Sequence, residues 1–216
     1  MKKNAIKMYE DYVSNNWDRQ NLIEKLVKKY KIKSALYPGS YIHITPSFLI
    51  PRVTYVDSDK KAKMFFKDES IYSYIEKHKE YKGKMILQFY PSDYTSKFED
   101  KEQQYDLLIS QYAGFISQSC KNYLKYGGIL IVNDSHGDAS MAYLDNEYEL
   151  IGVTNQSGSS WIISDENLEN YFIPKKKIEI TKEYLQQFGK EVKYKISASA
   201  YIFKKSKLIL CENTIQ

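Results

Sequence analysis

Short apolar segments alternate with segments of helical character between residues 34 and 132, and this alternation constrains the fold more than any other feature of the sequence. The apolar segments lie at 35–37, 53–56, 85–90, 107–110 and 129–132. The segments at 60–66, 68–79 and 114–126 carry apolar residues at the spacing of an amphipathic helix. Such alternation favours a parallel sheet with right-handed crossovers. The sequence therefore predicts an α/β fold, in which the wholly apolar segment 129–132 is covered on both faces.

Further helices and strands are expected on either side of this region. The first expected helix has its apolar face at Ile6, Tyr9, Val13 and Trp17, and a second helix follows it. Beyond residue 134 we expect strands at 148–154 and 196–203, a polar turn at 155–160, helices at 164–171 and 181–188, and a returning strand at 208–211. The pair Gly127-Gly128 is expected to end the helix at 114–126. Because no linker interrupts the chain, we expect residues 1–33 to form a helical cap and residues 34–216 to form one globular unit.

The composition is typical of a globular protein in water. Of the 216 residues, 43% are hydrophobic and 27% are charged. No apolar run approaches the roughly 20 residues that cross a bilayer, and the first residues lack the apolar core of a secretory signal. Cys120 and Cys211 match no metal-binding or disulfide spacing. We therefore expect a cytoplasmic protein with reduced thiols and no membrane partner.

The net charge of +5 does not favour a nucleic-acid surface. Nearly all of the positive charge is lysine, and arginine occurs only at Arg19 and Arg52. Phosphate and base recognition favours the planar fork of arginine. The lysines are also scattered among acidic residues instead of forming a stripe.

The first expected crossover, from residue 34 to 59, has features of a ligand-binding turn. Gly39 follows the first strand and allows the backbone to approach a ligand closely. Thr45-Pro46 is a good helix start and Pro51 stops the helix, so only about one turn fits between them. Asp57 ends the second strand, where a carboxylate can accept both hydroxyls of a ribose. In an open α/β sheet these positions lie at the carboxyl ends of the strands, where ligands bind.

The order of these elements resembles that of the class I S-adenosylmethionine-dependent methyltransferases. The resemblance covers residues 32–203 and rests on the strand order and on four segments. They are "YVDSD" at 55–59, "YDLLISQYAG" at 105–114, "LKYGGILIVND" at 124–134 and "ASAYIFKK" at 198–205. The resemblance implies a three-layer Rossmann-like sandwich with a mostly parallel seven-stranded sheet and an antiparallel last strand. It also implies S-adenosyl-L-methionine as the cofactor.

The resemblance also implies which residues would bind the cofactor. Asp57 and Ser58 would lie at the ribose, and Asp93 would lie near the adenine amine. The remaining positions form the loop after the first strand and the end of the fourth strand: Tyr37, Pro38, Gly39, Ser40, Ser110, Gln111 and Tyr112. Two departures from the family pattern stand out. "YPGSYIHITPS" replaces the glycine-rich loop, and "SQYAG" replaces the signature of enzymes that methylate base amino groups.

Asp134 and His136 are the candidate catalytic residues. They follow the fifth strand and so lie on the same side of the sheet as the cofactor loop. A histidine beside a carboxylate can take a proton from an acceptor hydroxyl or amine. Alternatively, His136 is a loop residue and Asp134 caps the next helix. Asp134, His136 and Asp138 come from one loop with no distant partner, which does not favour a metal site.

Two functions remain open from the sequence. One is a methyltransferase that acts on an unidentified acceptor and needs a base only if the acceptor must lose a proton. The other is a catalytically inactive binding or scaffold protein of the same fold, with its loop plugged by Tyr37, Tyr41 and Phe48. The sequence indicates neither the acceptor nor the oligomeric state.

Overall fold

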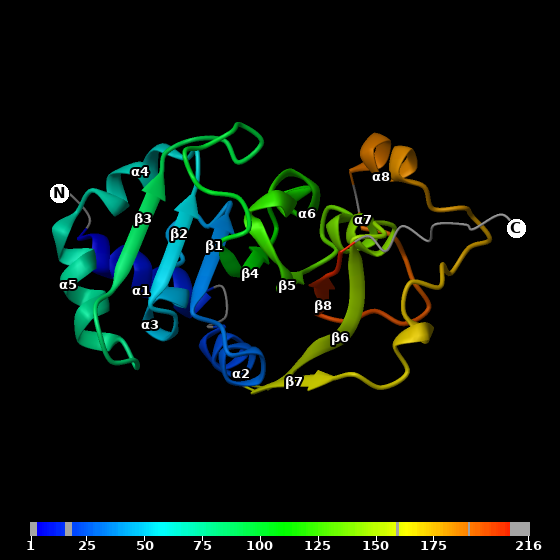
Figure 1. Ribbon diagram of the computed structural model, residues 1–216, viewed down its shortest axis with the longest axis horizontal. Helices are drawn as coiled ribbons and strands as arrows, with labels where there is room; N and C mark the ends of the chain where they lie inside the picture. The colour runs from blue at the N-terminus through cyan, green and yellow to red at the C-terminus, as the bar shows by residue number, and fades with distance from the viewer. Residues whose placement is uncertain (1–3, 16–18, 159, 190, 208–216) are drawn as a thin grey trace, which may run out of the picture.

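The computed structural model describes residues 4–15, 19–158, 160–189 and 191–207. At its centre lies an eight-stranded sheet with the strand order β3-β2-β1-β4-β5-β8-β6-β7 (Figure 1). Strands β1 to β5 pair in parallel, whereas β8 is antiparallel to both β5 and β6. The predicted α/β class is confirmed: the protein is a Rossmann-like sandwich with a mostly parallel sheet whose last strand is antiparallel.

The bounds of the elements follow the sequence closely in the first half of the chain. The strands are β1 (Ser34–Pro38), β2 (Arg52–Val56), β3 (Ile86–Tyr90), β4 (Tyr105–Ser110), β5 (Leu124–Val132), β6 (Tyr148–Ser157), β7 (Ser160–Ser164) and β8 (Ala200–Lys205). The helices are α1 (Ala5–Asn15), α2 (Gln20–Tyr30), α3 (Pro46–Leu49), α4 (Lys60–Phe66), α5 (Glu69–His78), α6 (Ile116–Ser119), α7 (Asp138–Tyr143) and α8 (Lys182–Phe188). Two 3-10 turns are η1 (Lys121–Tyr123) and η2 (Leu168–Asn170).

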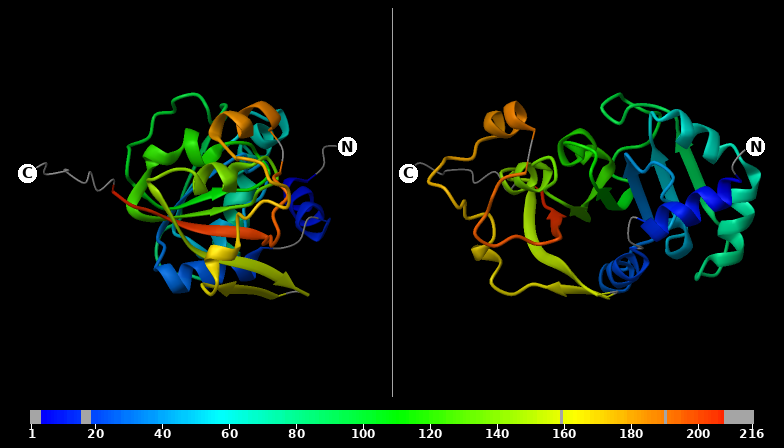
Figure 2. Two further views of the ribbon diagram at one scale, coloured as in Figure 1. Left: turned by 90° about the vertical axis from the view of Figure 1, so that its right-hand side faces the viewer. Right: turned by 180° about the vertical axis from the view of Figure 1, so that it is seen from behind.

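Hydrophobic side chains build one core on each face of the sheet. Along β1, Ala35 and Tyr37 belong to the core beneath α1 to α5, whereas Leu36 belongs to the core beneath α6, α7 and α8. This alternation is the two-residue period of a strand. The side view in Figure 2 places α2 on one side of the sheet and α6 and α8 on the other. Covered faces explain why the central strands are almost wholly apolar.

The first crossover helix is a single turn, as predicted. α3 begins at Pro46 and ends before Pro51, because the residue before a proline avoids helical geometry. Thr45 precedes the helix but does not cap it with its side chain. Its hydroxyl instead lies 2.8 Å from that of Tyr9 in α1. The N-terminal helices are thereby fastened to the loop that follows β1.

The N-terminal helices pack closely against the rest of the chain. α1 contacts α5, and α2 contacts both α3 and β7. The division into a cap at 1–33 and a unit at 34–216 stays a prediction. Trp17 and the strand expected at 208–211, which includes Cys211, lie outside the described residues.

The expected helix at 114–126 is wrong in its second half. α6 and η1 occupy its first part, and β5 already begins at Leu124, so Gly127 and Gly128 lie inside the strand. Gly127 has a φ of +78°, and the pairing of β4 with β5 shifts register nearby. A Cβ on Gly128 would lie 2.7 Å from the Leu124 side chain. The two glycines therefore serve an irregular start of β5 and not a helix end.

The expected helix at 164–171 is also wrong, and the polar turn expected at 155–160 is shorter than predicted, because β6 continues to Ser157 and an eighth strand, β7, begins at Ser160. β6 pairs with β7 in antiparallel fashion, with Ser157 opposite Ser160 and Val153 opposite Ser164. Trp161 is buried while Ile162 beside it is exposed, which is the alternation of a strand. The Trp161 backbone N–H donates to Oδ1 of Asn21 in α2 over 3.1 Å. Within residues 164–171 the only helical segment is the 3-10 turn η2.

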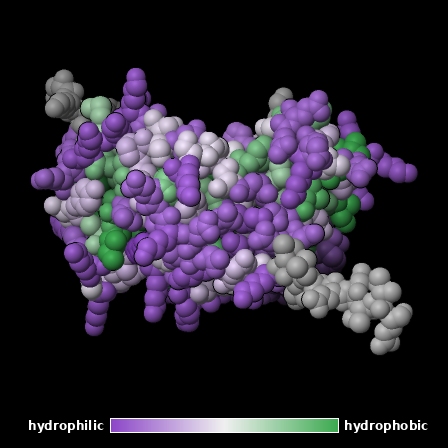
Figure 3. All heavy atoms as spheres, turned by 45° about the horizontal axis from the view of Figure 1, so that its top comes forward, coloured by the Kyte–Doolittle hydropathy of each residue, from purple (hydrophilic) through white to green (hydrophobic). Residues whose placement is uncertain are grey.

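The surface is mostly hydrophilic, and apolar side chains gather toward the two ends of the molecule in the face shown in Figure 3. No helix among the residues that the structure describes is long and apolar enough to span a membrane.

Candidate functional site

The turns that follow the parallel strands meet at one edge of the sheet. Pro38 pairs with Val56, Val56 with Tyr90, and Ser110 with Val132, so β1 to β5 end at the same level. All the residues predicted for the site lie in or directly after these strand ends. We call this edge the carboxyl edge.

Gly39 opens the turn after β1 and has no room for a side chain. Its φ is +62°, and a Cβ built on it would lie 2.2 Å from the Cβ of Ala113, in the turn after β4. Its backbone N–H donates to the Val56 carbonyl over 2.8 Å. The turn after β1 therefore touches the turn after β4, and a ligand at this point must lie against the outside of both turns.

Asp57, directly after β2, holds the same turn in place. Its Oδ2 accepts the backbone N–H of Tyr41 over 2.7 Å, and its Oδ1 accepts that of Asp59 over 2.8 Å. The side chain is half-buried, and Ser58 beside it is exposed. Each carboxylate oxygen keeps a second lone pair for a ligand hydroxyl. Asp59 caps α4 through the N–H groups of Lys61 and Ala62.

Tyr37 and Ser40 face the protein interior. Tyr37 is 2% exposed, and its hydroxyl lies 3.1 Å from Nδ1 of His43. Burial raises the pKa of Tyr37 and lowers the pKa of His43 to about 3, so both are neutral near pH 7. Ser40 is 1% exposed. Pro38, also buried, completes the end of β1. These side chains support the edge from below, while Gly39 and Asp57 form its accessible surface.

Arg19 reaches this edge from the segment before α2 and was not predicted. Its guanidinium carbon lies 5.4 Å above the centre of the Tyr112 ring. Its charge lowers the pKa values of Tyr37 and His43. The one sequence feature that could have singled out Arg19 is that arginine occurs at only two positions in this lysine-rich chain.

Strained backbone marks the carboxyl edge. Tyr112, after β4, has a φ of +57°, and Tyr41, after β1, has a φ of +49°. Left-handed conformations are costly for side chains of this size and recur at functional sites. The Tyr112 N–H donates to Oδ1 of Asn133 over 3.3 Å, and its ring is 58% exposed. Tyr112 thus joins the turn after β4 to the turn after β5.

Asp93 and Ser110 have structural partners, and Gln111 is buried. Asp93 is exposed, and hydrogen bonds from Thr95 lower its pKa. Ser110 is buried and donates to the carboxylate of Asp138. Gln111 is 7% exposed. Asp93 therefore offers an accessible carboxylate, whereas Ser110 belongs to the support beneath the edge.

Asp138 is a buried carboxylate beneath the turn after β4. It is 2% exposed and accepts the Ser117 backbone N–H at the start of α6 over 3.1 Å. Burial raises the pKa of Asp138 to about 6, against the bonds from Ser110 and Ser117 that lower it. Asp138 links α6 to α7 and lies away from solvent.

Asp134 lines a small polar cavity beside Tyr112. The cavity, about 160 Å³ in volume, lies between the turn after β5 and the chain that leads into β8. Burial raises the pKa of Asp134 to about 7, although Ser140 donates to its carboxylate from both backbone and side chain. The Ser140 hydroxyl in turn lies 2.6 Å from that of Tyr194. A carboxyl with a pKa near neutrality can exchange a proton with a bound molecule.

The other polar groups of this cavity come from sequence positions that were not predicted. Asn133 is 6% exposed, and its Nδ2 has no hydrogen-bond partner within the part of the chain that the structure describes. Tyr194 and Tyr201 line the wall opposite it. His136 is exposed in the turn before α7, and the bonds of Asp134 run to Ser140 instead of to His136. The bond from the Ser140 N–H to Asp134 at the start of α7 fits the alternative in which Asp134 caps this helix, and the role of His136 as a base stays a prediction.

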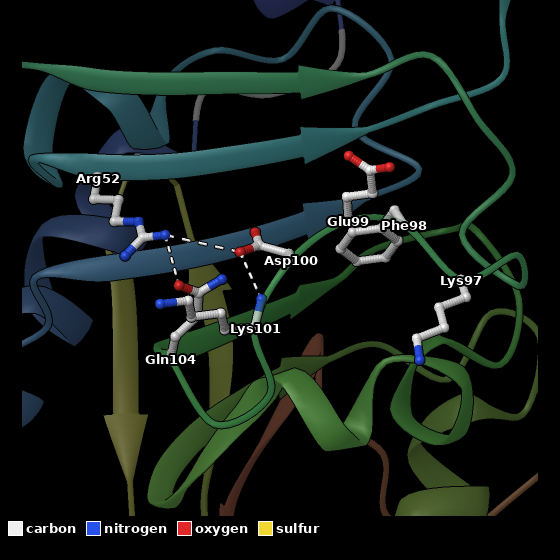
Figure 4. Close-up of a pocket in the computed structure, with 7 residues that line it drawn as sticks. All are labelled: Arg52, Lys97, Phe98, Glu99, Asp100, Lys101 and Gln104. Atoms are coloured by element: carbon white, nitrogen blue, oxygen red, sulfur yellow. Dashed lines mark hydrogen bonds and ion pairs between the residues drawn. The ribbon is translucent and has the colours of Figure 1, made fainter.

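A larger hollow runs along the sheet from Arg52 to Lys97, Phe98 and Glu99 near the strand ends (Figure 4). It is lined by Arg52, at the start of β2, and by the loop between β3 and β4. Arg52 donates to the Gln104 side chain over 2.6 Å and lies 3.9 Å from the Asp100 carboxylate. The guanidinium of Arg52 thus already has Gln104 and Asp100 of this loop as partners, so we do not favour this hollow as the ligand-binding site.

No group of three or more His, Cys, Asp or Glu side chains is arranged to hold a metal ion within residues 4–15, 19–158, 160–189 and 191–207.

Comparison with known proteins shows similarity in structure but not in sequence. No family model and no curated protein matches the sequence. A methyltransferase from Geobacter sulfurreducens matches with a TM-score of 0.50 and 10% identity, over 76% of this chain and 88% of that one. An O-methyltransferase from Bacillus cereus in complex with SAH matches with a TM-score of 0.49 and 10% identity, over 74% and 86% of the two chains. The O-methyltransferase TomG from Streptomyces achromogenes, in complex with SAM, gives a TM-score of 0.48 and 8% identity over 76% and 88%.

At these identities the likeness concerns the fold. The chain shares its fold with the Geobacter sulfurreducens methyltransferase, and the Rossmann-like α/β fold that the resemblance implied is confirmed at that level.

Proposed function

We propose that the protein is an S-adenosylmethionine-dependent methyltransferase that acts on an acceptor yet to be identified. The observation that supports this most is the position of Asp57, whose carboxylate lies directly beside the glycine turn at the carboxyl edge. A fold with this edge places ligands outside the ends of the parallel strands. The proposal includes a cytoplasmic location, which rests on the composition and on the free thiol of Cys120.

The residues at the edge fit the parts of the cofactor. Asp57 can accept the two ribose hydroxyls while it holds the Tyr41 backbone. Arg19 carries the charge and the fork geometry to bind the carboxylate of the amino-acid end. Gly39 allows the turn after β1 to pack against Ala113 in the turn after β4, which shapes the edge beside Asp57. When bound, the cofactor supplies a methyl group that its sulfonium already activates.

The cavity at Asp134 would receive the acceptor. Oδ2 of Asp134 can take the proton that an acceptor hydroxyl or amine loses, because the pKa of this carboxyl is raised to about 7. Ser140 and Tyr194 hold the carboxylate in place through two successive hydrogen bonds. Tyr112 lines this cavity and also lies under Arg19. The proposed acceptor site and the proposed cofactor site therefore share this residue.

A thermal-shift experiment tests the proposal. S-adenosylmethionine and S-adenosylhomocysteine should each raise the midpoint of unfolding, since a ligand at 100 times its dissociation constant adds about 2.7 kcal/mol of stability. Asp57→Asn should reduce both shifts. If neither compound shifts the wild type, the alternative of a non-catalytic binding or scaffold protein replaces the enzyme.

A further inference from the structure

We propose that the protein binds to anionic lipid surfaces through a basic arm between β7 and β8. The basic arm consists of residues 173–178 and 193–196. It lies at the α8 end of the molecule, where apolar and hydrophilic side chains lie side by side in Figure 3. This inference does not depend on the proposed methyltransferase activity.

The backbone of the arm sorts its side chains into an inner and an outer face. Pro174 forms an antiparallel bridge with Tyr194. The Lys175 N–H donates to the Lys193 carbonyl over 2.9 Å, and the Lys195 N–H donates to the Ile173 carbonyl over 2.8 Å. Tyr194 is buried against the core, and paired strands alternate their faces. The residues on either side of this pair, 173, 175, 193 and 195, therefore lie on the outer face together.

The arm also carries three exposed isoleucines, of which Ile173 belongs to the outer face. Ile173 is 37% exposed, Ile178 41% and Ile196 46%. Ile178 also lines an open hollow of about 610 Å³ with the lysines around it. A single exposed apolar residue is ordinary, but three on one short arm form a patch of the kind that marks an interaction site.

The arm carries five exposed lysines, of which Lys175, Lys193 and Lys195 lie on the outer face and Lys176 and Lys177 follow in the same segment. Lys175 and Lys193 lie directly across from one another, an arrangement that is unfavourable for like charges. None of these lysines forms an ion pair within the described ranges. The acidic residues nearest along the chain are Glu179 and Glu191, so the arm keeps a positive excess. An anionic partner would offset the repulsion.

The combination of isoleucine and lysine selects lipid over other anionic partners. At a membrane interface, apolar side chains enter the headgroup boundary while lysine ammonium groups meet anionic lipids. Nucleic-acid surfaces rely instead on arginine forks and aromatic stacking, and the arm presents neither on its outer face. The interaction would be peripheral and sensitive to salt.

Co-sedimentation with vesicles tests the inference on the full-length protein. We expect binding to phosphatidylcholine vesicles that contain ~30% phosphatidylglycerol, none to pure phosphatidylcholine, and release in about 0.5 M salt. Lys175→Gln/Lys176→Gln/Lys177→Gln should weaken binding at least about 10-fold. Ile178→Ser, which leaves the charge unchanged, should weaken it by roughly 3-fold or more. The matched control removes the same charge from exposed residues of α4, as Lys60→Gln/Lys61→Gln/Lys63→Gln, and should bind as the wild type does.

Each remaining result contradicts the inference. It fails if the wild type ignores anionic vesicles, or if the α4 control loses as much binding as the arm variant. Ile178→Ser with unchanged affinity would remove the apolar contribution and with it the lipid assignment. Binding of poly-glutamate or duplex DNA that is tighter than vesicle binding and equally sensitive to the arm variant would reassign the arm to an acidic protein or to nucleic acid. Circular dichroism and thermal melts of each variant separate these outcomes from loss of folding.

Discussion

The Oδ2 atom of Asp57 accepts the backbone N–H of Tyr41 over 2.7 Å, so the carboxylate proposed to bind ribose also fixes the turn after β1. Tyr41 has a left-handed backbone with a φ of +49°, and this hydrogen bond helps to hold that strained conformation. Ligand binding and the shape of the turn are therefore coupled through one side chain.

Asp57→Asn should weaken the binding of S-adenosylhomocysteine by roughly 10- to 100-fold. Asparagine keeps one acceptor oxygen for the Tyr41 N–H but loses the charge and one acceptor, which is worth about 1–3 kcal/mol. Titration calorimetry measures the change. The matched control is Asp68→Asn, the same substitution at the cap of α5. An unchanged affinity for Asp57→Asn, or an equal loss in the control, would remove Asp57 from the site.

Arg19→Gln should distinguish two ligands that differ only in the amino-acid end. S-adenosylhomocysteine has a carboxylate for the guanidinium to bind, whereas 5′-methylthioadenosine has none. We expect the affinity for the first to fall about 10-fold or more, the scale of a charge-assisted hydrogen bond, and the affinity for the second to change little.

The other arginine of the chain provides the control for this experiment. Arg52 lies at the start of β2 and is bound by Gln104, so Arg52→Gln should leave both affinities unchanged. Equal losses for both ligands in Arg19→Gln would show that Arg19 supports the fold of the edge and does not bind the carboxylate.

Gly39→Ala should destabilise the protein by more than 2 kcal/mol, because a Cβ there overlaps the Cβ of Ala113 and the φ of +62° disfavours any side chain. Gly189→Ala is the control, since its φ of +54° is similar but nothing lies within 4 Å of its Cβ. We expect that variant to lose about 1 kcal/mol. Adding Ala113→Gly should recover part of the loss in Gly39→Ala but none in Gly189→Ala. Urea denaturation measures all four proteins, and no recovery would argue against the contact between the two turns.

The buried carboxyl of Asp134 should make the wild type less stable as pH rises. Its pKa is raised to about 7 in the folded protein, so between about pH 4 and pH 7 the folded state binds more protons than the unfolded state. Its contribution to stability is therefore present below about pH 4 and is lost as the pH rises through about 7. Asp134→Asn should abolish this part of the decline. Denaturation curves from pH 4 to pH 8 test the difference between the two proteins, and parallel pH profiles would show that the carboxyl is not buried as described.

Much of the fold could be predicted because the spacing of apolar residues and the positions of turn-forming residues agreed with the tertiary structure. The strands at 53–56, 85–90, 107–110 and 129–132 are apolar and bounded by turns, and each appears within a few residues of its expected place. The errors arose where local signals are ambiguous. The pair Gly127-Gly128 is typical of a helix end, but it lies in the irregular first part of β5. The acidic residues at 164–166 are typical of a helix start, but Trp161 and its neighbours pair with β6.

The candidate site was predictable only where a residue follows a strand directly. Gly39, Asp57 and Asp134 could be placed at the carboxyl edge from their sequence positions alone. Arg19 could not be placed there, because it reaches the edge from the segment between two helices. Its contact at the edge is with Tyr112, which lies 93 positions later in the chain. Tyr194 and Tyr201 likewise meet Asn133 only through the path of the chain into β8.

Titration calorimetry of the wild-type protein with S-adenosylmethionine and S-adenosylhomocysteine tests the central claim most directly. The account predicts saturable binding of both with one site per chain, at micromolar dissociation constants, and no binding of free methionine at the same concentration. Absence of heat with both compounds, together with no thermal stabilisation at ligand concentrations of about 1 mM, where a micromolar ligand would add several kcal/mol, would contradict it.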